Sequence, residues 1–383
     1  MKYIYIKGVH FENKGAELML RAIMQKLEIA DTYRVVLMAN DASPFEKRCE
    51  LGAYQYFSLS FGPLDLNKLT YFLPKKLTRW LVKSYGIVLE PELYAVLDAS
   101  GYAYGDKWPV RGLKRTCSQL NRMIKNGKKY IFMPQMLGPF KNFKGRDLVK
   151  THFKNASLVV AREATSFACV NEIIGQSNNL IMGPDFTNLL KVDKVPRDKN
   201  KLLIIPNSNM VSDRSGHAQW KAQYLDIFET LIKAALNKGY NVTILNHEGK
   251  SDKPLCEKLA NSFSGQVELI QNYDALQIKA SIASAGLVVS SRFHGCVSAL
   301  SQGVACIGTS WSHKYEELYN DYDASELLIS KPDQIDDYTK FFHAVVESQE
   351  RVESIMVENG KTIKSESERI WSIIKDKLDG ING

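Results

Sequence analysis

The feature that most constrains the fold of this chain is the repeated alternation of short apolar strand segments with amphipathic helical segments. In the first half, strands are predicted at 3–6, 34–39, 95–99, 130–133 and 158–161, with helices at 16–27, 113–125, 145–154 and 165–174. In the second half, strands are predicted at 201–205, 241–245, 267–270, 287–289 and 304–308, with helices at 220–238, 253–262, 275–284, 295–302 and 334–379. Such alternation is typical of parallel sheets with helices on both faces.

The two alternating regions are separated by a charged, proline-containing stretch at 191–201, which has the composition of a linker. A length of 383 residues also suits two domains. We therefore predict an α/β protein with two Rossmann-like domains whose parallel sheets face a cleft, an arrangement similar to glycosyltransferase-B. The predicted boundaries are 1–190 and 201–335 for the domains and 336–383 for a C-terminal helical segment.

The composition limits where the protein works. No apolar run approaches the roughly 20 residues that span a bilayer, and the N-terminus has the pattern of a strand, not of a signal segment. The six cysteines are scattered without a CxxC pair, which indicates a reducing compartment and neither a disulfide framework nor a zinc site. We therefore expect a cytoplasmic location, with Cys296 and Cys306 in the core.

The charge is moderately positive, with a net value of +8, and can attract anionic substrates, nucleic acid or an anionic membrane. We find no nucleic-acid motif and expect no such partner. The segment 67–86 is locally basic, has no acidic residue and places leucines and Trp80 at helical spacing. This pattern is typical of a helix lying on a membrane surface, although an ordinary amphipathic helix with a solvated basic face fits the same residues.

The strongest indication of a ligand site lies in segment 286–315, where Arg292 and His294 fall between a short apolar strand and a helix. Ligands bind at the carboxyl ends of strands in open α/β sheets, and a helix N-terminus favours an anion. An arginine fork suits carboxylate or phosphate, and histidine titrates near neutral pH. His313 and Lys314 follow the next strand. We predict a site for an anionic substrate that needs a proton moved; the alternative is a surface salt bridge at Arg292 and a helix-capping His294.

Polar side chains also follow the strands of the first half. His10 and Asn13 have no evident local structural task, so binding of sugar hydroxyls is plausible, whereas Glu17 either joins them or stabilises the first helical turn. Tyr104 offers a ring that can stack on a sugar, and Gln135 an amide that can bind hydroxyls. Packing against the neighbouring loop and shaping of the backbone are the alternatives for these two residues.

Two further basic residues follow strands. Arg162 repeats in the first half the position that Arg292 has in the second, and on its own it would be assigned to a salt bridge with Glu163 or Glu172. His247 lies just past the strand at 241–245, where it faces either the cleft or solvent. The chain has no Walker A sequence, no GxGxxG after its first strand and no acidic cluster of the kind that holds magnesium, so we predict no metal site.

Taken in order along most of the chain, these motifs resemble those of the polysaccharide pyruvyl transferase family. The family's C-terminal motif is similar to SSRFHGCVSALSQGVACIG followed by Lys314. Its N-terminal loop and three later motifs are similar to GVHFENKGAELML, ASGYAYGD, PQMLGPF and AREATSF. The second of these departs from the family, which usually has two adjacent glycines at that strand end. No single motif is specific, and the resemblance rests on their order.

The resemblance implies transfer of a pyruvyl group from phosphoenolpyruvate to a sugar of a surface or exopolysaccharide precursor, giving a pyruvate ketal, with no cofactor besides this donor. The residues fit that chemistry. His294 is the candidate for proton transfer, and Arg292, Arg162, Lys314 and Ser291 are the candidates for binding the donor's phosphate and carboxylate. The candidates for binding the acceptor are His10, Asn13, Glu17, Tyr104 and Gln135. Domain 1–190 would then be the acceptor side and domain 201–335 the phosphoenolpyruvate side.

Two other functions fit the same frame. A glycosyltransferase with a nucleotide-sugar donor would use the same arginine to hold a diphosphate. A non-catalytic sugar-binding relative is the third possibility, and the intact Arg292, His294 and Lys314 disfavour it. The expected partners are phosphoenolpyruvate and a sugar acceptor, which a lipid could carry, together with weak peripheral contact at the inner face of the membrane.

Overall fold

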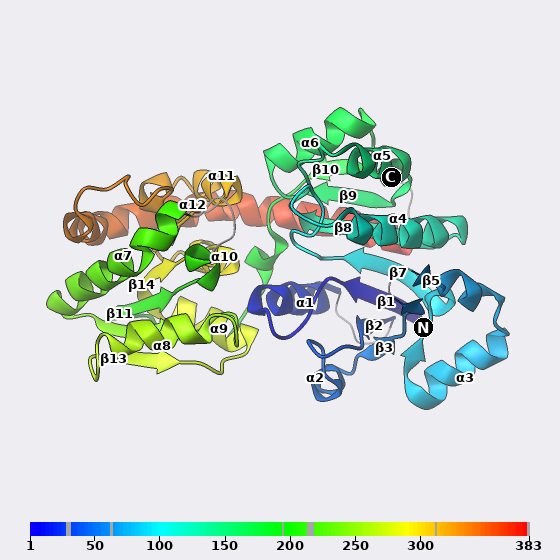
Figure 1. Cartoon of the computed structure of the whole chain (residues 1–383), viewed down its shortest axis with the longest axis horizontal. Coiled ribbons are helices and arrows are strands. Elements are labelled where there is room, and N and C mark those ends of the chain that lie inside the picture. The colour runs from blue at the N-terminus through cyan, green and yellow to red at the C-terminus, as the bar shows by residue number, and fades with distance from the viewer. Residues whose placement is uncertain (28–31, 62–63, 194, 213–217, 311, 381–383) are drawn as a thin grey trace. The chain divides into compact units, whose positions relative to one another are not determined.

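The chain forms two compact units, each built on one large parallel sheet (Figure 1). The computed structural model describes residues 1–27, 32–61, 64–193, 195–212, 218–310 and 312–380. Unit 1 comprises Met1–Phe11, Met19–Phe186 and Glu366–Gly383, and unit 2 comprises Glu12–Leu18 and Thr187–Ser365. The prediction of two parallel-sheet α/β domains is confirmed.

Unit 1 contains an eight-stranded sheet in the order β10-β9-β8-β7-β1-β2-β3-β6, and every neighbouring pair is parallel. The strands are β1 Lys2–Lys7, β2 Tyr33–Met38, β3 Tyr54–Tyr56, β6 Ile87–Val88, β7 Leu93–Asp98, β8 Lys129–Gln135, β9 Leu158–Ala161 and β10 Leu180–Met182. Strands β7 to β9 are buried along nearly their whole length, as expected when helices cover both faces of a parallel sheet.

The helices of this unit connect successive strands. They are α1 Lys14–Leu27, which begins in unit 2, then α2 Phe45–Glu50, α3 Lys75–Tyr85, α4 Val110–Lys125, α5 Phe143–His152 and α6 Ala164–Ile174. The short 3₁₀ helices are η1 Asn67–Phe72, η2 Glu90–Glu92 and η3 Phe153–Asn155, and η4 Phe186–Leu189 continues from unit 1 into unit 2. A small antiparallel pair, β4 Ser60–Phe61 and β5 Leu64–Asp65, precedes η1.

Unit 2 contains a six-stranded parallel sheet in the order β13-β12-β11-β14-β15-β16. Its strands are β11 Asp198–Ile205, β12 Asn241–Leu245, β13 Val267–Ile270, β14 Ala285–Ser290, β15 Cys306–Thr309 and β16 Leu328–Ile329. Its helices are η5 Ser208–Val211, α7 Ala218–Asn237, α8 Lys253–Asn261, α9 Ala275–Ala283, α10 Phe293–Ser301, α11 His313–Asp321, η6 Ser325–Leu327 and the start of α12 Tyr338–Asp379. Cys296 and Cys306 are fully buried in its core, as predicted.

The contacts divide the chain differently from the predicted boundaries. Residues 12–18, which we placed in the first domain, belong to unit 2, because the loop before α1 packs on residues of that unit. The stretch predicted as a linker lies within unit 2, which begins at Thr187; residues 191–193 and 195–197 have no regular structure, and β11 already begins at Asp198. Residue 194 lies outside the described residues.

The C-terminal helix is not a separate segment either. The first half of α12 buries Phe342 and Val352 in the core of unit 2. Its last turns belong to unit 1, where the Trp371 ring packs edge-to-face on Phe186 with ring centroids 6.0 Å apart. Because both ends of this helix supply core residues, α12 is part of both units. No helix in the described part of the chain combines the length and the apolarity that crossing a bilayer requires.

Candidate active site

The candidate site of unit 2 lies where the strand order of its sheet reverses. Strand β11 has β12 on one side and β14 on the other. Asn207 follows β11, Glu248 and Asp252 follow β12, and Arg292 follows β14. Because the strands are parallel, these residues gather at one edge of the sheet, which is where open α/β sheets bind ligands. We call Asn13, Glu248, Asp252, Arg292 and His294 the Arg292 site.

Arg292 is held by two carboxylates. Its Nε donates to Asp252 Oδ2 at 2.9 Å, a second nitrogen contacts Asp252 Oδ1, and the third contacts Glu248 Oε2. Arg292 is only 8% exposed, so the predicted alternative of a salt bridge is found, but it is buried and not on the surface. Burial lowers the pKa of Arg292 to about 10 and raises the pKa of Asp252 to about 6, so both remain charged at neutral pH. A guanidinium has five N–H groups, and the contacts with Asp252 and Glu248 use three of them.

The carboxylates are fixed in turn by other groups. The backbone N–H of Ser208 donates to Asp252 Oδ1 at 3.0 Å. The amide of Asn13 donates to Glu248 Oε1 at 2.6 Å, and its Oδ1 accepts from the backbone N–H of Ala16 at 3.1 Å. Asn13, which we predicted to bind acceptor hydroxyls, therefore uses its amide to tie the loop before α1 to Glu248.

His294 lies in the first turn of α10, and Arg292 is the N-cap residue of that helix. The predicted start near residue 295 is therefore two residues late, because Phe293 and His294 already have helical backbone. The histidine ring packs against the backbone at Gly15: a Cβ at that position would lie 2.3 Å from His294 Nδ1. The residue as a whole is half-buried, and its Nε2 is enclosed by protein.

His247 is buried just past β12 and does not face solvent, so the exposed-loop alternative is wrong. Burial, and then the charges of Arg292, His294 and Lys14, hold the pKa of His247 well below its usual range. Its Nε2 has no hydrogen-bond partner within the described part of the chain. The ring is therefore neutral at physiological pH.

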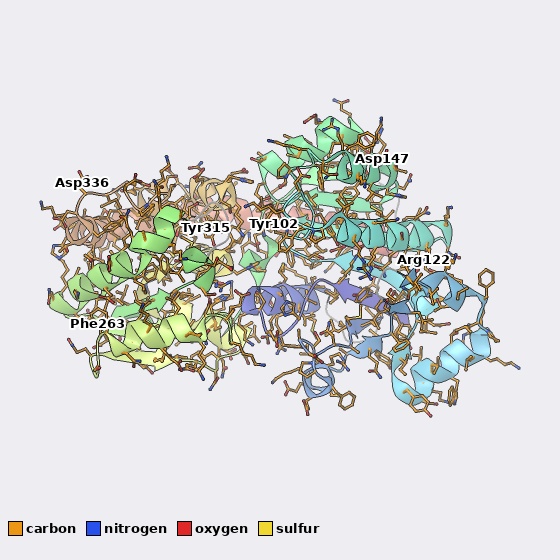
Figure 2. The ribbon with its side chains drawn as sticks, viewed as in Figure 1. Tyr102, Arg122, Asp147, Phe263, Tyr315 and Asp336 are labelled. Carbon is orange, nitrogen blue, oxygen red and sulfur yellow. The ribbon has the colours of Figure 1, made fainter. Side chains whose placement is uncertain are left out.

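Ser291 and Lys314 are the other two residues of unit 2 that we predicted to bind the donor, and they have different surroundings. Ser291 is fully buried, and its hydroxyl lies 2.6 Å from both the Tyr224 and the Thr309 hydroxyls. Its carbonyl accepts from the hydroxyl of Tyr315, which Figure 2 labels, at 2.8 Å. We therefore assign Ser291 to the support of the loop and not to donor contact. Lys314 lies in the first turn of α11, with Nζ 4.9 Å from the centre of the Phe293 ring.

Arg162 is the corresponding residue of unit 1, and it is also buried. Its Nε donates to Glu163 Oε1 at 2.8 Å and one terminal nitrogen to Asp185 Oδ2 at 3.1 Å. Glu172, the other predicted partner, pairs with Arg146 instead. The charge of Arg162 is thus balanced inside unit 1 by two acids, and its predicted role in donor binding stays a prediction.

The predicted acceptor residues of the first half are largely internal. Tyr104 is buried and donates to Asp98 Oδ2 at 2.7 Å, and Gln135 is buried and donates to the backbone oxygen of Asp98 at 2.9 Å. Tyr104 therefore fits the packing alternative, and Gln135 has its side chain in the interior, where it bonds to the backbone. Glu17 is buried with the ammonium of Lys14 2.9 Å from its carboxylate, and His10 is half-buried after β1.

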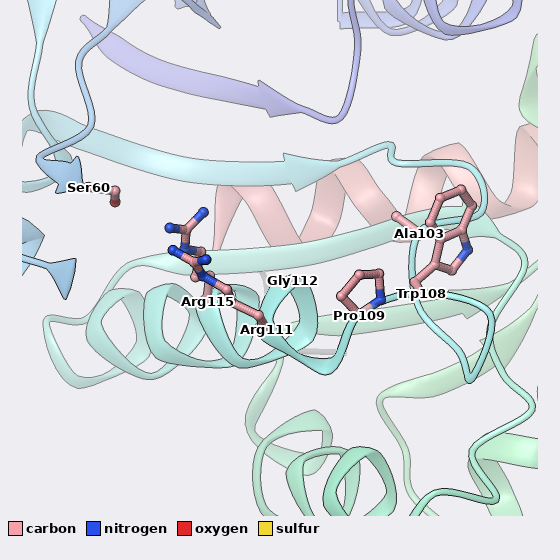
Figure 3. Close-up of a pocket in the computed structure, with 7 residues that line it drawn as sticks. All are labelled: Ser60, Ala103, Trp108, Pro109, Arg111, Gly112 and Arg115. Atoms are coloured by element: carbon pink, nitrogen blue, oxygen red, sulfur yellow. The ribbon is translucent and has the colours of Figure 1, made fainter. Parts of the chain in front are cut away.

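An open pocket of about 520 Å³ lies beside the first turns of α4 in unit 1. Figure 3 shows Arg111 and Arg115 from that helix, Trp108 before it and Ser60 from β4 around this space. Two arginines one helical turn apart and an exposed indole suit an anionic or sugar-bearing group. None of these residues was predicted from the sequence to bind a ligand.

Comparison with solved structures defines the class of fold. The chain is similar to the Anabaena protein HepE in complex with UDP and glucose, with a TM-score of 0.60, 14% identity and coverage of 100% of both chains. It is similar to the UDP-GlcNAc 2-epimerase of Neisseria meningitidis, with a TM-score of 0.59, 13% identity and coverage of 98% of this chain and 100% of the other. At such identities the likeness is one of fold: two parallel-sheet α/β domains of glycosyltransferase-B type.

The family is shown by the sequence match. The family model described as polysaccharide pyruvyl transferase matches residues 13–313, which is most of the chain. The chain therefore belongs to the polysaccharide pyruvyl transferase family, a class of enzymes. No curated protein matches it significantly.

Three residues at this sheet edge were not predicted from the sequence. Glu248 and Asp252 hold Arg292, and the Asn207 amide donates to the Ser291 carbonyl at 3.0 Å. The available signal was their position: all three follow predicted strands of the second half, and polar residues at such strand ends meet at one edge of a parallel sheet.

Proposed function

We propose that this enzyme transfers a pyruvyl group from phosphoenolpyruvate to two hydroxyls of a sugar in a polysaccharide precursor and thereby forms a pyruvate ketal. The observation that supports it most is the grouping, at one sheet edge of unit 2, of a half-buried histidine, a buried arginine and a lysine in the first turn of a helix. This combination suits a small substrate with two anionic groups and a carbon that must be protonated.

The reaction requires a balanced movement of protons. One proton is added to the methylene carbon of the donor, and a sugar hydroxyl adds to the central carbon and loses its proton. The bond from the central carbon to the phosphate oxygen breaks, and a second hydroxyl closes the ring. Of the two hydroxyl protons, one is balanced by the new methyl group and the other by the released phosphate.

The residues of the Arg292 site, together with Lys314, would divide these tasks among them. His294 is half-buried, with its Nε2 enclosed by protein, and is assigned to protonation of the methylene carbon. Lys314 and the N-terminal end of α10 supply positive potential for the donor's anionic groups, to which Arg292 adds its two remaining N–H groups. Glu248 is half-buried and lies at the same edge, so it is a candidate to accept a hydroxyl proton.

The test is phosphate release by the full-length protein supplied with phosphoenolpyruvate and a panel of sugars that carry two neighbouring free hydroxyls. We expect phosphate release and a pyruvate ketal by mass spectrometry, and His294→Ala to lower turnover on the order of a hundred- to ten-thousandfold while the protein stays folded. His343→Ala, on α12, is the matched control and should be as active as the wild type. Near-normal turnover by folded His294→Ala would remove this residue from the mechanism.

A nucleotide-sugar glycosyltransferase is the other candidate, because the similar folds include proteins solved with UDP. A parallel incubation with nucleotide sugars distinguishes the two. Release of nucleoside diphosphate with the same acceptors, together with no reaction of phosphoenolpyruvate, would replace the pyruvyl proposal.

A further inference from the structure

Unit 1 presents an exposed surface that is both apolar and basic. It is formed by residues 67–86, here called the α3 segment, which consists of η1, Pro74 at the N-cap and α3. Phe72 is 84% exposed, Trp80 50% and Leu69 49%. Single exposed apolar side chains are ordinary, but several from one short segment indicate a surface that meets another apolar phase.

The orientation of α3 keeps these side chains outward. The helix turns Thr78 and Val82 toward unit 1, where the Thr78 hydroxyl donates to Glu92 Oε1 at 2.6 Å. Residues three apart share one side of a helix. Leu77 and Trp80 therefore form a stripe turned away from Thr78 and Val82, and Lys76, Arg79 and Lys83 form the adjacent stripe of the exposed surface.

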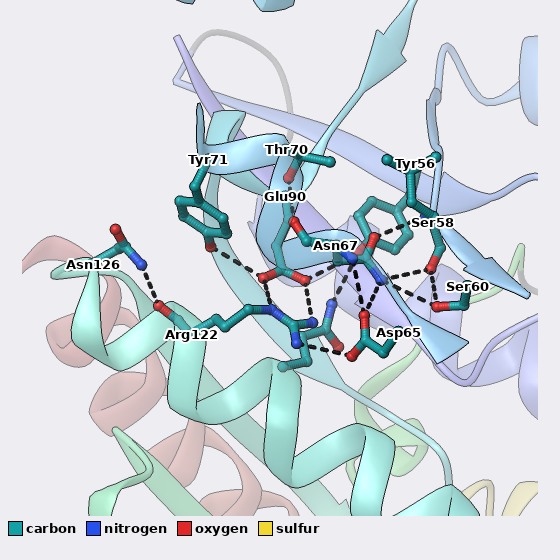
Figure 4. A network of polar contacts seen from close by, with 12 residues as sticks. Tyr56, Ser58, Ser60, Asp65, Asn67, Thr70, Tyr71, Glu90, Arg122 and Asn126 are labelled. Atoms are coloured by element: carbon teal, nitrogen blue, oxygen red, sulfur yellow. Dashed lines mark hydrogen bonds and ion pairs between the residues drawn. The ribbon is translucent and has the colours of Figure 1, made fainter. Parts of the chain in front are cut away.

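Hydrogen bonds and ion pairs fix the first residues of the α3 segment on unit 1. The exposure of its apolar side chains is therefore not due to a detached segment. Figure 4 shows the polar network beneath it. Arg122 of α4 donates to Glu90 Oε1 at 2.6 Å and to Asp65 Oδ2 at 2.8 Å. Asn67, the first residue of η1, donates to Asp65 at 2.7 Å, and the Tyr71 hydroxyl donates to Glu90 at 3.1 Å. This network fixes η1 on unit 1, immediately before the exposed Phe72.

The charge of the α3 segment is uniformly positive. It has no acidic residue, and its basic residues are Lys68, Lys75, Lys76, Arg79 and Lys83. None of the five forms an ion pair within the described ranges, and the acid nearest in sequence, Asp65, is paired with Arg122. These charges are therefore available to an anionic surface.

We propose that the α3 segment docks unit 1 on an anionic lipid bilayer. The exposed Phe72, Leu77 and Trp80 would enter the interfacial region, and the basic stripe would face anionic head groups. An indole suits this position because it combines an apolar body with a polar N–H. A second copy of the chain fits less well, because a two-fold contact would bring five positive charges against five others.

The test uses the full-length protein and sedimentation with vesicles. We expect binding to phosphatidylcholine vesicles that contain phosphatidylglycerol at low salt, weaker binding at high salt, and little binding to phosphatidylcholine alone. Replacing Lys76, Arg79 and Lys83 by glutamine should weaken binding on the order of a hundredfold. Replacing Lys238, Lys258 and Lys331 by glutamine removes the same charge from exposed positions of unit 2 and should leave binding nearly unchanged.

Four outcomes would overturn the proposal. They are absence of binding to the anionic vesicles at low salt, equal binding to neutral vesicles, equal loss in both triple variants, and unchanged binding after Phe72→Ala with Trp80→Ala. Two further measurements test whether another partner covers this surface. Sedimentation velocity without lipid tests a second copy of the chain, and binding to polyglutamate tests an acidic protein. A dimer that Trp80→Ala abolishes, or polyglutamate binding without vesicle binding, would assign the surface to a second copy or to an acidic partner. None of these readouts depends on the proposed reaction.

Discussion

At the scale of single residues, the buried carboxylates decide what Arg292 can do. An arginine at a strand end can hold a ligand alone, but this one is bound by Asp252 and Glu248, which use three of its five N–H groups. A buried ion pair contributes little net stability while it is intact, and breaking it leaves an uncompensated buried charge. The residue thus joins two strand ends of unit 2 as much as it serves a substrate.

Arg292→Lys tests this dual role. A lysine keeps the positive charge but cannot reproduce three directed contacts to two carboxylates. We expect the free energy of unfolding to fall by about 3 kcal/mol in urea titration, and phosphate release to fall in the fraction that stays folded. Arg146→Lys is the control, because the ion pair of Arg146 with Glu172 is on the surface, and it should change stability by less than about 1 kcal/mol. Equal stability of the two variants would contradict the assignment.

Gly15→Ala tests whether the loop before α1 positions His294. The added Cβ would lie 2.3 Å from His294 Nδ1, so the ring must move. We expect turnover to fall by about tenfold or more, because a misplaced proton donor loses its reach to the substrate. The matched glycine is Gly360 in α12, where an added Cβ lies 3.5 Å from the Tyr322 ring. Gly360→Ala should keep full turnover and gain about 0.5–1 kcal/mol of stability. A fully active Gly15→Ala would show that His294 does not depend on this contact.

At the scale of elements, the long helix α12 supplies core residues to both units, and the sequence pattern predicts only that it is a helix. Its periodic apolar residues predict a helix, and the structure confirms one at Tyr338–Asp379. The same periodicity does not say which core each turn enters. The helix ends in unit 1, where Trp371 is nearly fully buried against Phe186. The last turns of the chain are therefore a core component of the first domain.

Trp371→Ala tests that assignment. Removing a fully buried indole costs about 3–5 kcal/mol through lost apolar burial and the cavity left behind. We expect the unfolding transition of unit 1 to shift to a lower urea concentration. Tryptophan fluorescence and circular dichroism measure that transition. Phe143→Ala removes an aromatic ring that is 81% exposed and should leave the transition within about 0.5 kcal/mol. A wild-type transition for Trp371→Ala would mean that the end of α12 does not support unit 1.

At the scale of the whole molecule, buried ionisable groups make stability depend on pH. His247 is neutral in the folded protein because burial and neighbouring cations hold its pKa well below the usual 6.5. The unfolded chain takes up a proton at that residue below about pH 6.5, and the folded chain does not. The unfolded state then binds more protons, so this residue makes stability fall as the pH drops below that value.

His247→Gln should therefore flatten the acid side of the stability curve. Each pH unit below about 6.5 costs the wild type up to about 1.4 kcal/mol through this residue, and the variant lacks that contribution. Urea titrations of unit 2 unfolding at pH 7.5 and pH 5.5 measure the difference. His343→Gln, on α12, is the control and should follow the wild type. Parallel curves for His247→Gln and wild type would show that His247 titrates alike in both states.

Much of the fold follows from local pattern, because strand and helix periodicity is a property of short segments. The strands at 158–161, 241–245 and 267–270 were predicted with the bounds that the structure has. The strands β3, β4, β5, β6, β10 and β16 were not predicted. Each has only two or three residues, which is too short for an alternating pattern, and each is stabilised by pairing with a neighbouring strand.

The candidate site also has a part that local sequence predicts and a part that depends on tertiary packing. The sequence by itself determined that Arg292 and His294 stand at a strand end before a helix, because that depends on consecutive residues. Only the tertiary structure decided their partners: Asp252 lies 40 residues from Arg292 in the chain and meets it because β12, β11 and β14 are neighbours in the sheet. It also turned Ser291, Tyr104 and Gln135 inward, since the direction of a loop side chain depends on what packs around it, and that information is not local.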